Sequence, residues 1–368
     1  MSEIKMMHCK DGRTQLQHVY VETADGKFKY EVFMDYAKDL PEDLDMIPYN
    51  GNIAGGFCDV DDNLYCVLRG GSGASPFSPG PKTCIVMLDP EGHYVKKIGE
   101  GKLGPVHFGN MTPEGKSFMI TTTNQQEVLE MDMDGNILAR VGGRYNGNKP
   151  HNLELDPHYI RMHYGLYGTE PMFYGGGHGN PYDQMLDFIN TQYCEEPFNC
   201  PNGVDFDSKG NMYVCDGYGN YAIHKFDRQG NHIKTWGGKG VFDYKTDTPG
   251  KFLVPHTLCV DANDHIWVCD REKDAIHVFD TEGNVIAYCS HEMAQPSGVD
   301  TDGTYVYVVG RGGYLTIFDL EFNIVGQLGF FNGNLRGHDL AADSKGNLYL
   351  FPTHANEEHQ VIALKRVK

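Results

Sequence analysis

The sequence predicts an all-β protein, and specifically a six-bladed β-propeller, from three observations. A pattern of alternating apolar residues, glycine-containing turns and aromatic residues recurs six times along the 368 residues. The copies that begin at Pro255, Pro296 and Gly337 are each 41 residues apart, which is enough chain for about four short strands. The last copy is one strand short, and the alternating segment from about Tyr20 to Phe33 can complete it.

The repeat is most regular in residues 201–216, which read Pro-Asn-Gly-Val-Asp-Phe-Asp-Ser-Lys-Gly-Asn-Met-Tyr-Val-Cys-Asp. A second alternating segment at 223–227 follows, and then a Gly-Asn turn at 230–231. Such alternation interrupted by short turns predicts strand, hairpin and strand. The same register begins again at Ile53, Val106, Pro255, Pro296 and Gly337.

We expect one domain over residues 1–368, with an insertion at about 144–200 between the second and third blades. This stretch, from about Arg144 to Cys200, is rich in Tyr, Gly, His and Pro. Loops of this length are uncommon unless they are functional, so a lid over the active rim is one hypothesis. A loop that serves packing or oligomerisation is the alternative. The sequence leaves the oligomeric state open.

The composition excludes some classes of function. A formal net charge of -19 argues against nucleic acid as a partner, because phosphate binding needs a basic face. The chain has no run of about 18 apolar residues and no apolar signal segment at its start, so we expect a cytoplasmic protein without membrane contact. Its ten cysteines lack paired CxxC spacing and fit strand positions as reduced core thiols.

Three histidines occupy one slot of the repeat in alternate copies: His107, His256 and His338. In a propeller the first strand of each blade lines the central channel, so this slot forms a ring. The ring consists, in order, of Ala54, His107, Asn202, His256, Ser297 and His338. Three imidazoles about 120° apart predict a metal site with one open position, as in catalytic zinc sites. Copper, nickel and iron(II) remain possible on ligand type, and a hydrogen-bonded channel lining without metal is the alternative.

A second register places charged groups at the same rim of the channel. Arg69, Arg271 and Arg311 each stand four residues beyond the aromatic residue of a blade's second strand, and Tyr218 follows Gly217 in the third blade. Arginine can bind a substrate carboxylate through two parallel hydrogen bonds. A nearby guanidinium also favours the ionised form of a phenol, which suits Tyr218 as a general base.

At these residues the chain resembles a known family. The segments 214–220 (Val-Cys-Asp-Gly-Tyr-Gly-Asn), 252–258 (Phe-Leu-Val-Pro-His-Thr-Leu) and 269–272 (Cys-Asp-Arg-Glu) resemble the catalytic core of peptidyl-α-hydroxyglycine α-amidating lyase, a propeller of NHL-like repeats. The resemblance spans the repeats from about residue 53 onward. It implies a catalytic zinc on His107, His256 and His338, with Tyr218 as the catalytic base. It further implies that Arg69 and Arg271 are active-site arginines and that Asp339 binds a structural calcium.

The chain departs from the family pattern at two places. Arg336-Gly337-His338 stands where the family has Met-Pro-His, and Gly219 replaces the cysteine that follows the catalytic tyrosine in the animal enzymes. The extra arginine predicts a more anionic substrate, so we expect Arg311, Arg336 and Asn202 to contribute to substrate binding.

The resemblance implies cleavage of a carbinolamide to an aldehyde acid and an amide or urea, and a small α-hydroxy acid such as a ureidoglycolate-like metabolite is the expected substrate. Two other functions remain open. Propeller lactonases also act at a central metal, but they use carboxylate and asparagine ligands, and Asn202 is the only such residue in the ring. A non-enzymatic repeat module that binds proteins predicts no metal at all.

Overall fold

The computed structural model of the chain describes the propeller repeats and the segments around them. The described residues are 19–44, 46, 53–69, 83–104, 106–123, 127–142, 198, 201–218, 220–240, 248–290, 293–329, 335–352 and 360–367. The insertion predicted at about 144–200 lies outside them except for Phe198, so its role as a lid stays a prediction.

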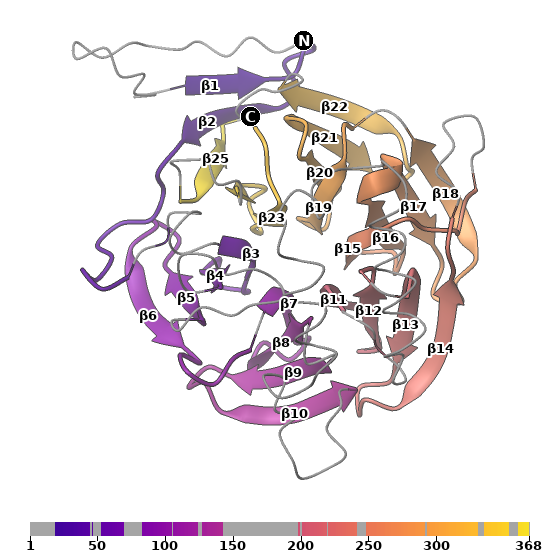
Figure 1. Cartoon of the computed structure of the whole chain (residues 1–368). Helices are drawn as coiled ribbons and strands as arrows, with labels where there is room; N and C mark the ends of the chain where they lie inside the picture. The colour runs from indigo at the N-terminus through magenta and orange to yellow at the C-terminus, as the bar shows by residue number, and fades with distance from the viewer. Residues whose placement is uncertain are drawn as a thin grey trace, which may run out of the picture.

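Six antiparallel sheets surround a central axis, which confirms the predicted six-bladed propeller (Figure 1). Blade one comprises β3 (Ile53–Cys58), β4 (Leu64–Leu68), β5 (Cys84–Leu88) and β6 (Tyr94–Ile98). Blade two comprises β7 (Val106–Met111), β8 (Ser117–Thr122), β9 (Glu127–Asp132) and β10 (Ile137–Gly142). Blade three comprises β11 (Gly203–Phe206), β12 (Met212–Asp216), β13 (Ala222–Phe226) and β14 (His232–Gly237).

Blade four comprises β15 (Pro255–Val260), β16 (Ile266–Asp270), β17 (Ala275–Phe279) and β18 (Val285–Ser290). Blade five comprises β19 (Pro296–Thr301), β20 (Tyr305–Gly310), β21 (Tyr314–Asp319) and β22 (Ile324–Gly329). The innermost strands β3, β7, β11, β15, β19 and β23 contact one another in a closed circle. The first strand of each repeat therefore lines the channel, as the sequence predicts.

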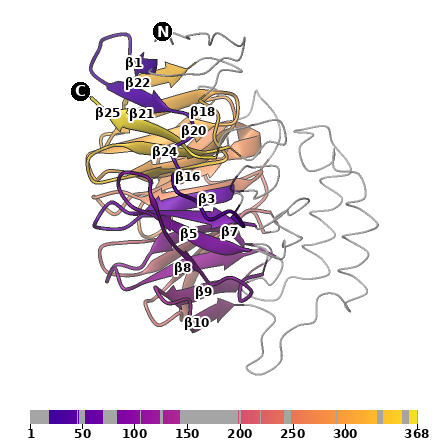
Figure 2. The ribbon, with the colours of Figure 1, turned by 90° about the vertical axis from the view of Figure 1, so that its left-hand side faces the viewer.

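The sixth blade joins the two ends of the described chain. It contains β23 (Asp339–Ala342), β24 (Leu348–Phe351) and β25 (Ile362–Arg366), and β25 pairs with β2 (Lys29–Phe33). The predicted closure by the N-terminal segment is confirmed, although that segment is a hairpin rather than one strand. Its first strand, β1 (Val19–Glu22), lies outside β2 and beside β22 of blade five (Figure 2).

In four of the six blades, the first hairpin is held by an aspartate six residues before an aromatic residue. In blade five the spacing is five residues, and blade two has Thr112 at this position. In blade three, Asp207 Oδ2 accepts hydrogen bonds from the Tyr213 hydroxyl (2.9 Å) and from Asn211 Nδ2 (2.8 Å). Blade four uses Trp267, whose Nε1 donates to Asp261 Oδ2 at 2.8 Å. Buried polar groups must be satisfied in this way, which explains why the Asp-to-aromatic spacing marks the repeat.

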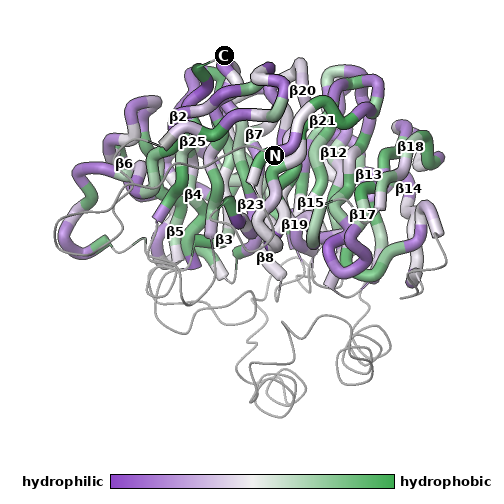
Figure 3. Tube along the Cα trace, turned by 90° about the horizontal axis from the view of Figure 1, so that it is seen from above, coloured by the Kyte–Doolittle hydropathy of each residue, from purple (hydrophilic) through white to green (hydrophobic). Residues whose placement is uncertain are grey.

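Apolar side chains fill the wedges between neighbouring blades. Trp267, which is 1% exposed, packs against Phe318 of the next blade with ring centroids 5.3 Å apart. The edge-on view of Figure 3 shows hydrophobic residues along the strands and hydrophilic residues mostly at the turns. Because every blade packs on two neighbours, the strand ends at the centre are held in fixed positions.

Candidate metal centre

The three ring histidines meet at the centre of the propeller. His107 lies on β7, His256 on β15, and His338 immediately precedes β23. Their ring centroids are 5.0, 5.1 and 4.7 Å apart, and one nitrogen from each lies within 4.8 Å of the other two. Among the described residues, no other group of three histidine, cysteine or acidic side chains meets so closely.

Backbone carbonyls of the three intervening ring residues fix the orientation of each imidazole. The Nδ1 atoms of His107, His256 and His338 lie 3.1, 2.7 and 2.6 Å from the carbonyl oxygens of Asn202, Ser297 and Ala54, respectively. A carbonyl only accepts hydrogen bonds, so each Nδ1 carries the proton and each Nε2 keeps its lone pair. Contacts of this kind orient metal-binding histidines in proteins.

The histidines are neutral as well as oriented. Burial lowers the pKa of His107, His256 and His338 well below the usual range, and nearby positive charge lowers it further. The charges come from Arg69 and Arg271 at His107 and from Arg271 at His256. Neutral imidazole is the form that binds a metal, so no proton has to be displaced.

Tyr218 lies directly against this cluster. Its hydroxyl oxygen is 2.9 Å from His107 Nε2 and 3.0 Å from His256 Nε2, and the side chain is 3% exposed. Because both Nε2 atoms are acceptors in this tautomer, the phenol can donate its proton to only one at a time. The Tyr218 oxygen thus occupies the space in which a reacting group next to a metal would lie.

The turn that carries Tyr218 depends on the preceding glycine. A Cβ at Gly217 would lie 2.0 Å from the carbonyl oxygen of Pro255 and 2.8 Å from Asn202 Nδ2, so no side chain fits there. The Gly217 N–H donates to Asn202 Oδ1 (3.1 Å), and Asn202 Nδ2 donates to Pro255 O (3.1 Å). The Asn202 amide therefore holds the Tyr218 turn against the strand of His256, and its predicted contact with substrate stays a prediction.

Arg69 and Arg271 approach the cluster from blades one and four. Both are buried, and Arg69 Nε donates to the carbonyl oxygen of Val106 at 3.3 Å. The Arg271 guanidinium carbon is 5.8 Å from the ring centroid of Tyr218. Arg271 also pairs with Glu272, through Nη2 at 2.7 Å and Nε at 3.0 Å. Glu272, which was not among the predicted site residues, holds the guanidinium in one orientation.

The two remaining predicted arginines flank the site in the chain. Arg311 follows β20, and its N–H donates to Gln295 O at 3.0 Å, while Arg336 stands two residues before His338. Both side chains are partly buried. Their role in substrate binding stays a prediction.

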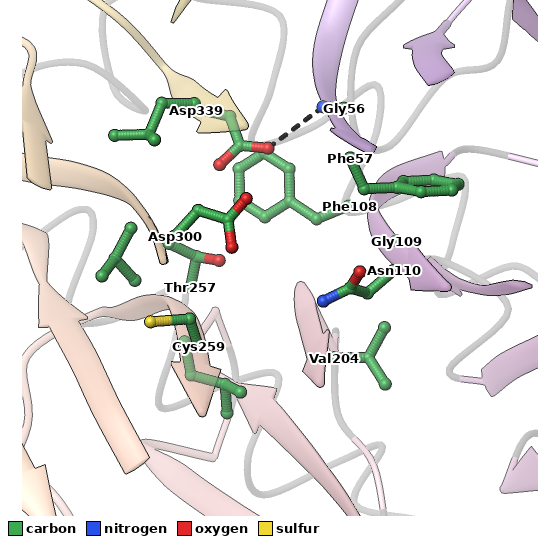
Figure 4. A pocket seen from close by; sticks show the side chains of 13 residues that line it. Gly56, Phe57, Phe108, Gly109, Asn110, Val204, Thr257, Cys259, Asp300 and Asp339 are labelled. Atoms are coloured by element: carbon green, nitrogen blue, oxygen red, sulfur yellow. Dashed lines mark hydrogen bonds between the residues drawn. The ribbon is translucent and has the colours of Figure 1, made fainter. Parts of the chain in front are cut away.

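A second polar space, drawn in Figure 4, shares the Phe108 side chain with the histidine cluster. It is a cavity lined by Asp339, Asp300, Thr257, Asn110 and Phe108, among others. The Phe108 ring also contacts all three imidazoles, with centroids 4.0 Å from His107, 5.2 Å from His256 and 5.1 Å from His338. The apolar Phe108 ring thus lies between the histidine cluster and the cavity that contains the Asp339 and Asp300 carboxylates.

The oxygen-lined cavity fits the calcium expectation for Asp339. The Asp339 carboxylate is buried and accepts a hydrogen bond from the Gly56 N–H at 3.2 Å. Burial raises the pKa of Asp339 well above its usual range, and the charge of Asp300 adds to this effect. Calcium prefers oxygen ligands, and a cation would compensate these buried carboxylates. The ion itself stays a prediction.

Asp205 and Asp300 were not among the predicted site residues, although the sequence contains a signal for them. Each stands three residues after a ring position that is not histidine, Asn202 and Ser297 respectively. Asp205 accepts from Val260 N (2.7 Å) and from Asn110 Nδ2 (2.8 Å), which joins three blades. Burial raises the pKa of both Asp205 and Asp300 to about 7.

Asp205 gives a testable dependence of stability on pH in chelator-treated protein. Its folded pKa of about 7 lies above the unfolded value of 3.8, so the native state binds more protons between these values. The contribution of Asp205 to wild-type stability therefore falls as pH rises through this window, by up to about 1.4 kcal/mol per pH unit. Asp205→Asn lacks this contribution. We expect denaturant titrations from pH 4.5 to 7.5 to show a steadily growing advantage for the variant, and parallel curves would contradict the assignment.

The fold and the site together define a class: six-bladed β-propellers with three convergent, neutral histidines at the centre. Residues 165–309 match the family model described as the SMP-30/Gluconolactonase/LRE-like region, which is less than half of the chain. A 171-residue stretch is 29% identical to peptidyl-glycine alpha-amidating monooxygenase A of Xenopus laevis and covers 40% of this chain and 17% of that protein. A 76-residue stretch is 36% identical to the Rattus norvegicus peptidylglycine alpha-amidating monooxygenase and covers 20% of this chain and 8% of that protein.

The aligned stretches thus span less than a fifth of these relatives' lengths. Among solved structures, a gluconolactonase from Xanthomonas campestris is similar with a TM-score of 0.55 and 10% identity, covering 94% of each chain. A streptogramin B lyase gives a TM-score of 0.52 at 10% identity, covering 92% of this chain and 98% of that one. At this identity the likeness concerns the fold alone.

The described segments contain no helix long and apolar enough to cross a membrane.

Proposed function

We propose that the protein is a zinc-dependent lyase that cleaves the carbon–nitrogen bond of a carbinolamide derived from a small α-hydroxy acid. The observation that carries this proposal is the Tyr218 hydroxyl, which lies 2.9 and 3.0 Å from the Nε2 atoms of two of three convergent histidines. A proton acceptor so close to a Lewis-acid site is what removal of a hydroxyl proton requires. The sequence similarity to amidating monooxygenases and the resemblance to the amidating lyase family support it.

The donor set fits zinc. Three neutral imidazoles with carbonyl-bound Nδ1 atoms leave three Nε2 lone pairs directed at one point, and zinc accepts such nitrogen ligands with a fourth position open. The bound ion would supply a Lewis acid that lowers the pKa of the substrate hydroxyl.

Tyr218 and the two buried arginines then have separate roles in the reaction. Tyr218 as phenolate takes the hydroxyl proton, the carbonyl forms, and the carbon–nitrogen bond breaks. The amide nitrogen leaves with the bonding electrons and takes up a proton, which gives an aldehyde acid and an amide or urea. Arg271, 5.8 Å from the Tyr218 ring, favours negative charge on the phenol, and Arg69 and Arg271 are suited to bind the substrate carboxylate.

Lactone hydrolysis is a second candidate. It is favoured by the match of residues 165–309 to the SMP-30/Gluconolactonase/LRE-like model and by the similar fold of a gluconolactonase. Against it stands the donor set, because the nitrogen-only cluster lacks carboxylate ligands, and the Asn202 amide already bonds Gly217 and Pro255.

A substrate comparison tests the proposal. Purified protein, treated with chelator and then reloaded with zinc, is offered ureidoglycolate, an N-acyl-α-hydroxyglycine and a sugar δ-lactone. We expect release of an aldehyde acid from a carbinolamide, lost with chelator and restored by zinc. Metal-dependent opening of the lactone alone would replace the lyase with a lactonase, and no bound metal would favour a binding module.

A further inference from the structure

Two blades contain a buried aspartate–histidine pair in the same register. Asp216 ends β12, and its Oδ2 lies 3.2 Å from Nε2 of His224 on β13. Asp270 ends β16, and its Oδ2 lies 3.5 Å from Nε2 of His277 on β17. All four residues are at most 3% exposed. Each histidine is paired across the sheet with the valine two residues before the aspartate.

The repeat itself does not require these pairs. Two positions of each blade are compared. The first is the last residue of the second strand, and the second is the residue on the third strand that pairs with the position two before it. In the other four blades, neither an aspartate nor a histidine stands at these positions. These positions hold Leu68 and Val86, Thr122 and Leu129, Gly310 and Thr316, and Phe351 and Ala363. The aspartate–histidine pair thus occurs in the two blades that supply Tyr218 and Arg271.

The position of each aspartate in the chain connects it to the candidate site. Asp216 directly precedes Gly217-Tyr218, and Asp270 directly precedes Arg271. Asn220 Nδ2 donates to Asp216 Oδ2 at 2.6 Å, so this carboxylate also closes the turn that contains Tyr218.

Asp270 makes a second connection, to the strand of a predicted metal ligand. Its carboxylate accepts the N–H groups of Leu253 (3.0 Å) and Val254 (2.7 Å), the residues that lead into Pro255-His256. The Arg271 N–H donates to the carbonyl of Val254 at 3.0 Å. One buried carboxylate thus holds the approaches to His256 and to Arg271 together.

His277 is oriented toward this carboxylate. Its Nδ1 accepts a hydrogen bond from the Gly250 N–H at 3.0 Å, so in the neutral ring the proton is on Nε2, which faces Asp270. The ring packs against Phe252, with centroids 4.9 Å apart. His224 is held in a similar way, because its Nδ1 lies 2.7 Å from Thr235 Oγ1.

We infer that these two aspartate–histidine pairs are positioning residues, which hold the turns of Tyr218 and Arg271 in register with His256. The inference rests on the proposed metal site. A positioning role differs from a role in stability alone. It predicts that a substitution in the Asp270 pair weakens metal binding more than a substitution at an equally buried residue elsewhere in the propeller. Outer partners that orient a metal site commonly change metal affinity by about 10–100-fold.

The test compares three variants by zinc affinity, by the visible spectrum of the cobalt-loaded protein and by thermal unfolding without metal. Asp270→Asn places an amide N–H₂ against the N–H of His277. Asp270→Asn with His277→Gln restores a matched pair, since the glutamine carbonyl can accept from the new amide. Thr316→Val is the control, because Thr316 occupies the corresponding buried position in blade five.

We expect Asp270→Asn to weaken zinc binding about 10-fold and to shift the cobalt spectrum, with recovery in the double variant. The zinc affinity of Thr316→Val should stay within about twofold of wild type, because Thr316 does not orient the site. If Asp270→Asn does not fold, His277→Asn serves instead, because its carbonyl can still accept from Gly250 while the group facing Asp270 is lost. If Asp270→Asn binds zinc as tightly as Thr316→Val does, the positioning role is wrong, while the proposed function still stands. Wild-type protein without stoichiometric metal overturns the proposed function and this inference with it.

Discussion

Replacing His256 with alanine is expected to reduce bound zinc from about one ion per chain to background. The side chain supplies one of three converging Nε2 atoms, and its Nδ1 is already held by Ser297 O at 2.7 Å. Removing it leaves two imidazoles, fewer than the three protein ligands of a catalytic zinc site. The loss of zinc affinity should exceed the roughly 10–100-fold effect of removing a residue that only orients a metal ligand. Plasma mass spectrometry on protein purified without added metal measures it.

His265→Ala is the matched control. His265 lies in the same blade, in the hairpin between β15 and β16, where its Nδ1 bonds Asp261 Oδ2 at 3.1 Å. It should retain full zinc content. Equal metal in wild type and His256→Ala would exclude the three-histidine cluster as the binding site.

Tyr218→Phe is expected to lower kcat for carbinolamide cleavage by roughly 10²–10⁴-fold, the usual contribution of a positioned general base. Its zinc content should be unchanged, because the phenol is next to the histidines without orienting them: each Nδ1 bonds a backbone carbonyl instead. The substitution removes only the oxygen that lies 2.9 Å from His107 and 3.0 Å from His256. Steady-state kinetics on zinc-loaded protein separate this loss from metal loss.

Tyr221→Phe provides the comparison for this variant. Tyr221 is buried three residues further along the same turn and belongs to the apolar cluster that also contains Tyr218. Its kcat should stay within a few-fold of wild type. Full activity of Tyr218→Phe would assign the proton transfer to another group.

The periodic features of the chain were predictable because they are local. The spacing from Asp207 to Tyr213 marks a hairpin wherever it recurs, and the six copies of the wider strand-and-turn pattern require six blades. Once the blades are placed, the ring slot follows by symmetry, which is why His107, His256 and His338 could be grouped before any contact was known. The closure of the last blade followed from counting strands.

Contacts between different blades were not predictable in the same way. The sequence does not reveal that Gly217 approaches the Pro255 carbonyl, because this contact depends on how two blades are packed. Nor does it reveal that Phe108 separates the histidines from Asp339, since alternation predicts which face of a strand a residue occupies but not its neighbour across the channel. Asp205 and Asp300 were not predicted because they stand three residues beyond the ring position of their blades, and repeat symmetry alone marks only the ring position.

The joined sixth blade couples assembly of the histidine cluster to closure of the ring of blades. The chain leaves the ribosome from its N-terminal side, so β2 pairs only with β1, and its other edge stays unpaired until β25 emerges. His338, the third of the converging histidines, immediately precedes the inner strand of this same blade. A nascent chain therefore brings its third imidazole into place as β25 covers this edge of β2, and a chain truncated before His338 lacks both the third imidazole and the covered edge.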